Sequence, residues 1–310
     1  MNIDETIKTI ERIQERVKKD IHDEEGMEFL QKKWEAYQER DKLIWSDEIV
    51  ERLKTEPLPE GHKLGLPALD DLTGGFRLQQ LITMFAATKH GKSQFAMWMA
   101  GVLQHLNPVM LLLEQKPDEV VSQFLERKYD IPKFLTPADQ ETFVLTDWIE
   151  EKVMEGKARF GTQLVIVDHL GYIDNNGKDG KYKRENLAYR IEMTMKEIKG
   201  IAKRWNVILI LFSHIKEGDD TNPPVLEDLY GSSGIKKESD TVISMWRKNY
   251  KEGKVKIYED KTMLSVLANR RFGKNGNVGL DFNVKTGEYE YNHDWVKEME
   301  EIAKSKSNDF

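Results

Sequence analysis

Cysteine is absent from the 310 residues. A chain without cysteine forms no disulfide bonds and no cysteine-ligated zinc sites, and it has no thiolate nucleophile, which fits a reducing compartment. No apolar run approaches the ~20 residues that a membrane-spanning helix needs. The first residues also lack the basic and apolar regions of a signal peptide. These absences predict a cytoplasmic protein with no membrane partner.

An excess of positive charge is missing as well. Acidic residues number 54 against 47 lysines and arginines, which gives a formal net charge of −7. This balance argues against wholesale wrapping of nucleic acid, although a narrow basic strip inside a groove or ring remains compatible with it, because such contacts are local. With 33% charged and 39% apolar residues, the chain is expected to be globular with a well-solvated surface.

Changes in composition divide the chain into four parts. We expect a helical N-terminal region at 1–55, a linker at 56–63, a core at 64–295 and a charged tail at 296–310. Apolar residues three and four positions apart predict the N-terminal helices. Their apolar stripe either packs on its own domain or docks on a neighbouring subunit. The linker carries two prolines and a glycine, which stop helices.

The core alternates strands with helices, the pattern of an α/β fold with a mainly parallel sheet. Near-continuous apolar runs predict strands that are buried on both faces; they lie at 81–85, 109–113, 164–167, 207–212 and 241–245. Helices are expected at 93–105, 117–128 and 184–205. C-terminal antiparallel strands are expected at 255–258, 264–268 and 278–282, with a turn at 273–276 before the last.

The segment 81–93 is the most informative. It predicts a strand, a tight turn that ends in Gly-Lys-Ser, and a helix, which is the layout of a phosphate-binding loop. We expect Lys92 to reach the terminal phosphates of a bound nucleotide and the Ser93 hydroxyl to ligate Mg²⁺. A chance match is the alternative, since Ala86 stands where the motif usually has glycine. The expected nucleotide-binding residues are Ala86, Ala87, Thr88, Lys89, His90, Gly91, Lys92 and Ser93.

Three polar residues end predicted strands, at the edge where parallel sheets bind ligands. Asp168 is expected to hold Mg²⁺ opposite Ser93. Glu114 is expected to orient or deprotonate the attacking water. His214 is expected to contact the terminal phosphate as a neutral imidazole. Helix capping by Asp168 and Glu114, and a merely structural role for His214, are the alternatives.

Cations mark three further segments. Arg270 and Arg271 end a predicted strand, either as a solvated strand end or as a finger that reaches a neighbouring subunit's γ-phosphate. Two glycine-containing loops carry lysines, which favour contact with a phosphodiester backbone or simply form a solvated face. The candidate DNA-binding residues are Lys178, Lys181, Lys183, Arg184, Gly231, Ser232, Ser233, Gly234 and Lys236.

Taken together, residues 64–291 resemble the DnaB-like replicative helicases, the ring-forming branch of RecA-type ATPases with phage and plasmid members. The co-linear motifs are GLPALDDLTGG (65–75), AATKHGKS (86–93), LLLEQKP (111–117), LVIVDHL (164–170), LFSHIKE (211–217), DLYGSSGIKKESDTV (228–242) and LANRRFGKNGNVGL (267–280). Each motif is modest, whereas their common order is specific.

The resemblance implies a RecA-like core and an ATP- and Mg²⁺-dependent helicase that translocates on single-stranded DNA during replication. It implies a homo-oligomeric ring, expected to be a hexamer, with primase, a loader or a polymerase as further partners, in the host cytoplasm if a phage encodes the chain. In this family's pattern Glu114 is the base, Asp168 the metal-side carboxylate and Arg271 the finger, and loops around 174–184 and 228–236 face DNA.

This sequence departs from the family pattern in places. His214 replaces the usual glutamine, as in some phage members, and Asn269 replaces a lysine. Tyr230 stands where an arginine is frequent, and residues 217–220 are acidic. Two other functions stay open: a recombinase or clock-type ATPase that does not unwind DNA, and a loader or adaptor that uses nucleotide as a switch.

Overall fold

The protein divides into two units, Met1–Pro59 and Glu60–Phe310. The computed structural model describes residues 44–138, 144–173, 183–216, 221–229, 231–253 and 255–297. In the first unit it describes helix α3 (Ser46–Thr55), which has acidic residues in its first turn and basic residues in its last. This distribution complements the helix dipole. The other helices predicted for the N-terminal region lie outside the described residues.

The second unit is built on a single sheet with the strand order β2-β3-β4-β1-β5-β6-β7-β8. Its strands are β1 (Leu81–Ala86), β2 (Val109–Leu112), β3 (Leu164–Asp168), β4 (Ile208–His214), β5 (Thr241–Glu252), β6 (Val255–Asn269), β7 (Gly276–Phe282) and β8 (Tyr289–Tyr291). The strands from β2 to β5 run parallel, and β6, β7 and β8 extend the sheet antiparallel. The expected α/β class is confirmed.

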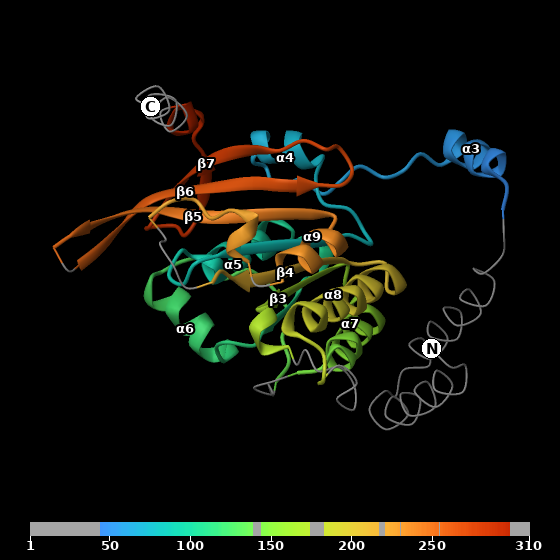
Figure 1. Ribbon diagram of the computed structural model, residues 1–310, viewed down its shortest axis with the longest axis horizontal. Helices are drawn as coiled ribbons and strands as arrows, with labels where there is room; N and C mark the ends of the chain where they lie inside the picture. Colours follow the sequence, from blue (N-terminus) through green and yellow to red (C-terminus); the bar gives the residue numbers. More distant parts are fainter. Residues whose placement is uncertain are drawn as a thin grey trace. The chain divides into compact units, whose positions relative to one another are not determined.

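Helices cover both faces of the sheet. They are α4 (Pro67–Thr73), α5 (Lys92–Val102), α6 (Pro117–Glu126), α7 (Thr146–Phe160), α8 (Leu187–Arg204) and α9 (Ser232–Glu238). Short 3₁₀ turns occur at Gln104–Leu106, Leu170–Tyr172 and Leu226–Asp228. Figure 1 shows α7 and α8 together on one side of the sheet.

Side chains of β1 alternate between two hydrophobic clusters, one on each face of the sheet. Along β1, Ile82 and Met84 join the cluster beneath α5 and α6, whereas Leu81 and Phe85 join the cluster beneath α7 and α8. All six residues of β1 are buried, as expected for a strand covered on both faces. The phosphate-loop sequence therefore follows a strand that is buried along its whole length.

The antiparallel part differs from the prediction. Residues 255–258 and 264–268 were expected in separate strands, but they lie in the single strand β6, which pairs with β5 as far as Glu252 and Val255. Figure 1 shows this hairpin extending beyond the neighbouring strands as a two-stranded arm. Polar residues at 259–262 hid the continuity, because they interrupt the apolar pattern without breaking the strand. Between β6 and β7, residues 270–275 make the predicted turn.

Three helices were missed, the first of them α4. Helix α7 was not predicted, and α9 occupies residues that we expected to form a glycine-rich loop. The first predicted helix also ends early, at Val102, and is followed by the 3₁₀ turn. At the C-terminus, Val296 was expected to begin the charged tail, but it is buried together with Trp295. Among the described residues, no helix is long and apolar enough to cross a membrane.

Candidate nucleotide site at the carboxyl edge of the sheet

The phosphate-loop sequence connects the end of β1 to the start of α5. Gly91 precedes the helix with φ +87°, a left-handed conformation that favours glycine. A Cβ atom there would lie 3.3 Å from the Tyr289 hydroxyl. The free backbone N–H groups of the first turn of α5 therefore follow a tight turn, which is the geometry that favours binding of an anion such as phosphate.

Residues of the C-terminal strands β5 and β6 contact the phosphate-loop sequence. His90 is buried, and its Nδ1 accepts a 2.9 Å hydrogen bond from the backbone N–H of Arg247 in β5. The His90 ring also meets the edge of the Tyr258 ring in β6, with centroids 5.5 Å apart. His90, expected to bind nucleotide, thus directs its side chain into the sheet. Only its backbone remains for a phosphate.

Lys92 is held inside the site. Its Nζ lies 3.0 Å from His214 Nδ1, 3.3 Å from the Ala87 carbonyl oxygen and 3.5 Å from that of Ala86. Burial lowers the pKa of Lys92 to about 8, although the carboxylates of Asp168 and Glu114 oppose this shift. Charge on this ammonium is therefore costly until a further anion approaches.

Ser93 and Asp168 form the polar pair expected of a metal site. The Ser93 hydroxyl donates a 2.6 Å hydrogen bond to Asp168 Oδ2. Asp168 Oδ1 is buried and has no hydrogen-bond partner. Burial raises the pKa of this carboxyl, while Ser93 and Lys92 lower it. An unsatisfied buried carboxylate oxygen beside a hydroxyl fits a hard cation such as Mg²⁺, which prefers oxygen ligands.

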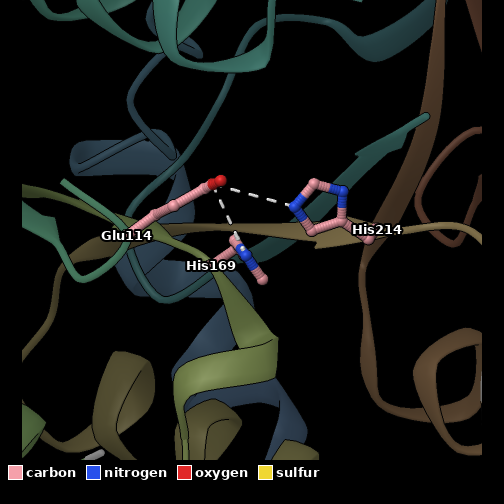
Figure 2. A group of neighbouring side chains, drawn as sticks. All are labelled: Glu114, His169 and His214. Carbon is pink, nitrogen blue, oxygen red and sulfur yellow. Dashed lines mark ion pairs between the residues drawn. The ribbon is translucent and has the colours of Figure 1, made fainter. Parts of the chain in front are cut away.

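Glu114 reaches the same place from the edge of the sheet. Strands β3 and β4 separate β2 from β1, so Glu114 does not begin beside the phosphate loop. Its Oε2 nevertheless lies 3.5 Å from His169 Nε2 and 3.8 Å from His214 Nε2, as Figure 2 shows. The Glu114 side chain is 39% exposed, so its carboxylate is partly open to solvent.

His214 stands at the centre of the site because of strand register. In the parallel pairing of β1 with β4, His214 is opposite Ala86, the first residue of the phosphate-loop sequence. Burial and the nearby Lys92 lower the pKa of His214, with Glu114 opposing. A neutral imidazole at neutral pH follows, which agrees with the protonation state that we expected.

His169 was missed by the sequence reasoning. It follows Asp168 directly, and its ring meets the His214 ring edge-on with centroids 4.1 Å apart. Burial, aided by His214 and Lys92, lowers its pKa to about 3. The available signal was its position in LVIVDHL, one residue beyond a strand that ends at the binding edge of the sheet. The structure brings together Lys92, Ser93, Glu114, Asp168 and His214 as predicted, and adds His169.

Arg271 is separate from this group. Thr241, which begins β5, pairs with Asn269, which ends β6, so the arginines after β6 lie at the amino edge of the sheet, opposite the phosphate loop. Arg271 is exposed, with its guanidinium over the Phe272 ring at 5.4 Å. Arg270 donates to the Lys237 carbonyl oxygen. Asn269 is buried and donates to the Leu72 carbonyl oxygen, which gives this departure from the family pattern a structural role.

Comparison with known proteins identifies what the chain is similar to. Residues 138–291 match the family model of the DnaB-like helicase C-terminal domain. That segment is a DnaB-like helicase domain. Similar proteins include the replicative DNA helicase DnaC of Bacillus subtilis (strain 168), with 24% identity over 294 residues. That alignment covers 83% of this chain but 63% of the relative, so the chain spans less than two thirds of the relative's length.

Solved structures show the same fold. One solved ATPase domain has a TM-score of 0.61 at 17% identity, covering 86% of this chain and 98% of that domain. A DnaB-like replicative helicase, described with its interactions with primase, has a TM-score of 0.64 at 17% identity, covering 92% and 75%. The RecA-like core that the sequence resemblance implied is therefore confirmed as the fold.

The DNA contacts expected in this DnaB-like helicase domain stay predictions. Lys178 and Lys181 lie outside the described residues, while Lys183 and Arg184 are exposed just before α8. Ser233 and Lys236 are exposed on α9. The expectation of a flexible glycine loop is wrong from residue 232 onward. A Cβ at Gly234 would lie 2.8 Å from Glu192 Cα, and one at Gly231 would meet the Ile191 side chain, so both glycines permit close packing of α9 on α8.

Proposed function

We propose that this chain is an ATP-dependent DNA helicase that translocates on single-stranded DNA as a ring of identical subunits. The observation that carries the proposal is the convergence of Lys92, Ser93, Asp168, Glu114 and His214 at one edge of the sheet. An ammonium, a hydroxyl–carboxylate pair, a second carboxylate and a neutral imidazole are the groups that phosphoryl transfer to water requires. The match to the DnaB-like helicase C-terminal domain supports DNA as the substrate.

Each side chain has a distinct task in ATP hydrolysis. The first turn of α5 and Lys92 would bind the β- and γ-phosphates, and Lys92 would turn from His214 toward them. Ser93 and Asp168 would hold Mg²⁺, which neutralises phosphate charge when bound. Glu114, open to solvent on one side, would orient the attacking water and accept its proton. His214 Nδ1, released from Lys92, would be free to respond to the γ-phosphate.

Arg271 supports a site shared between subunits. It lies at the opposite edge of the sheet from its own phosphate loop, so within one chain it has no route to the reacting phosphate. In the proposed ring, the amino edge of one subunit would face the nucleotide of the next, where an arginine would stabilise charge in the transition state. We further propose primase as a partner, because one similar structure is described with its interactions with primase.

Strand displacement tests the proposal. The full chain with ATP and Mg²⁺ should separate a fluorescently labelled forked duplex, and the same preparation should release phosphate. Lys92→Ala should abolish both activities by removing the cation that binds the phosphates. Glu114→Gln should retain nucleotide binding but lose phosphate release, because the amide accepts no proton at neutral pH. Lys285→Ala, which removes an exposed lysine from the turn between β7 and β8, is the matched control and should behave like the natural chain.

The outcomes separate the competing functions. Hydrolysis without strand displacement, but with pairing of homologous strands, would assign the chain to the recombinase type. Nucleotide binding with negligible turnover would indicate a nucleotide-switched loader or adaptor. Phosphate release that survives Lys92→Ala would contradict the assigned nucleotide site itself.

A further inference from the structure

The two histidines beside Glu114 are both held by donors on the side that faces away from it. His169 Nδ1 accepts a 3.0 Å hydrogen bond from the backbone N–H of Gly171. His214 Nδ1 lies 3.0 Å from the Lys92 ammonium, which is a donor only. A neutral imidazole has one N–H, so a ring whose Nδ1 accepts carries its proton on Nε2.

Both Nε2 atoms face the same carboxylate oxygen. They lie 3.5 Å and 3.8 Å from Glu114 Oε2, and Figure 2 shows both ion pairs starting from this one oxygen. Two N–H groups thus point at Oε2, and this leaves Oε1 for a water molecule. The distances exceed those of ordinary hydrogen bonds. Contacts of catalytic groups are frequently long in a free enzyme and shorten when substrate binds.

The Nδ1 contacts of the two histidines respond differently to nucleotide binding. The partner of His214 is Lys92, whose ammonium is needed by the phosphates, so this histidine changes partners when nucleotide binds. The partner of His169 is a backbone N–H in the turn Leu170–Tyr172. That turn is fixed by local hydrogen bonds, including Tyr172 N–H to the His169 carbonyl oxygen. His169 therefore presents its N–H to Glu114 whether or not nucleotide is present.

We infer that His169 is a positioning residue for Glu114: it carries an Nε2–H fixed by the Gly171 backbone and holds Oε2 so that Oε1 faces the attacking water. This inference rests on the proposed ATPase function. It assigns to His169 a role that concerns the orientation of the base and not the binding of nucleotide. The same three residues place one ligand atom each within 4.8 Å of one another, so a transition-metal site is the competing interpretation.

The hydrogen bonds argue against a metal. A histidine that binds a metal through Nε2 normally donates its Nδ1–H to an oxygen. Here His169 Nδ1 faces a donor, so metal binding would bring two N–H groups together and forfeit the bond from Gly171. The positioning role keeps every one of these contacts.

A pair of amide variants separates the two sides of the His169 ring. His169→Asn keeps an acceptor near the Nδ1 position but has no group that reaches Glu114. His169→Gln places an N–H near the Nε2 position. We expect His169→Asn to lower kcat about ten-fold, the value of a hydrogen bond to a charged group, with KM for ATP unchanged. His169→Gln should recover most of that loss. In the Glu114→Gln background, His169→Asn should have no further effect.

His169→Phe and the exposed control His105→Phe complete the series. His169→Phe keeps the ring but no N–H, and should resemble His169→Asn, whereas His105→Phe should leave kcat unchanged. Equal kcat for the Asn and Gln variants, whether reduced or normal, would overturn the inference, since a role in packing does not distinguish them. Inhibition by micromolar Zn²⁺ in millimolar Mg²⁺ that His169→Asn abolishes would also overturn it, in favour of the metal site. No hydrolysis by the natural chain would refute the proposed function instead.

Discussion

The lowered pKa of Lys92 predicts that nucleotide affinity depends on pH. Burial lowers this pKa to about 8, whereas bound phosphate favours the charged ammonium and raises it. Affinity should therefore be complete below about pH 8 and fall as the pH rises through that value. With a pKa of about 8, roughly nine tenths of the lysines are charged at pH 7 and about one tenth at pH 9, which corresponds to about ten-fold weaker binding.

Fluorescent ADP provides the assay. Its dissociation constant should be measured from pH 6.5 to 10 at constant ionic strength with chelator present, so that metal binding does not contribute. We expect a level region, a break near pH 8, and then a ten-fold loss of affinity for each further pH unit until the pKa of the complex is reached. Lys92→Arg is the control, because a guanidinium stays charged throughout this range.

Two results would refute this reasoning. Constant affinity up to pH 10 in the natural chain would mean that the buried ammonium keeps an ordinary pKa, so burial does not dominate over Asp168 and Glu114. A break of the same size in Lys92→Arg would mean that a different group titrates. In either case Lys92 could not be the source of the pH dependence.

Two further predictions concern the packing of α9 and the shared site. Gly234→Ala should lower the free energy of unfolding by about 1–3 kcal/mol, because its Cβ would lie 2.8 Å from Glu192 Cα. Denaturant unfolding measures this change, with the exposed Ser233→Ala as control. An unchanged unfolding midpoint would show that α9 shifts away from α8 at no cost in stability. Arg271→Ala and Glu114→Gln should each be inactive in phosphate release yet regain activity when mixed. In a mixed ring, some sites combine an intact Glu114 with an intact Arg271 from the neighbouring subunit. Absence of recovery would exclude an arginine supplied by a neighbour.

The sequence predicted the parallel strands well, because burial on both faces leaves near-continuous apolar runs that few other structures produce. Helix α7 was harder. Its buried positions Thr146, Ile149, Val153 and Gly156 have helical spacing, but only two of them are large and apolar, so the stripe is weak. Helix α9 contradicts local preference, since glycine favours turns. Its packing against α8, which only the fold reveals, stabilises it.

The site was predictable residue by residue but not as an arrangement. Lys92, Ser93 and Asp168 follow strands in a recognisable order, which is enough to place them at one edge. Local sequence patterns do not determine the order of strands in the sheet. Nothing in the sequence therefore indicated that Glu114, which follows an edge strand, contacts His214. His169 was missed for the same reason. Its importance depends on the Gly171 N–H that fixes its proton and on a carboxylate 55 positions earlier in the sequence.

The support beneath the phosphate loop has a consequence for the order in which the chain is made. Arg247 bonds to His90, the Tyr289 hydroxyl lies close to Gly91, and Gln94 donates to the Gly287 carbonyl oxygen. These partners are synthesised some 150 to 200 residues after the loop that they support. When the phosphate-loop sequence emerges from the ribosome, the C-terminal residues that contact it have therefore not yet been synthesised. If the loop binds a triphosphate as proposed, we expect it to do so only late in translation, once the final antiparallel strands have joined the sheet.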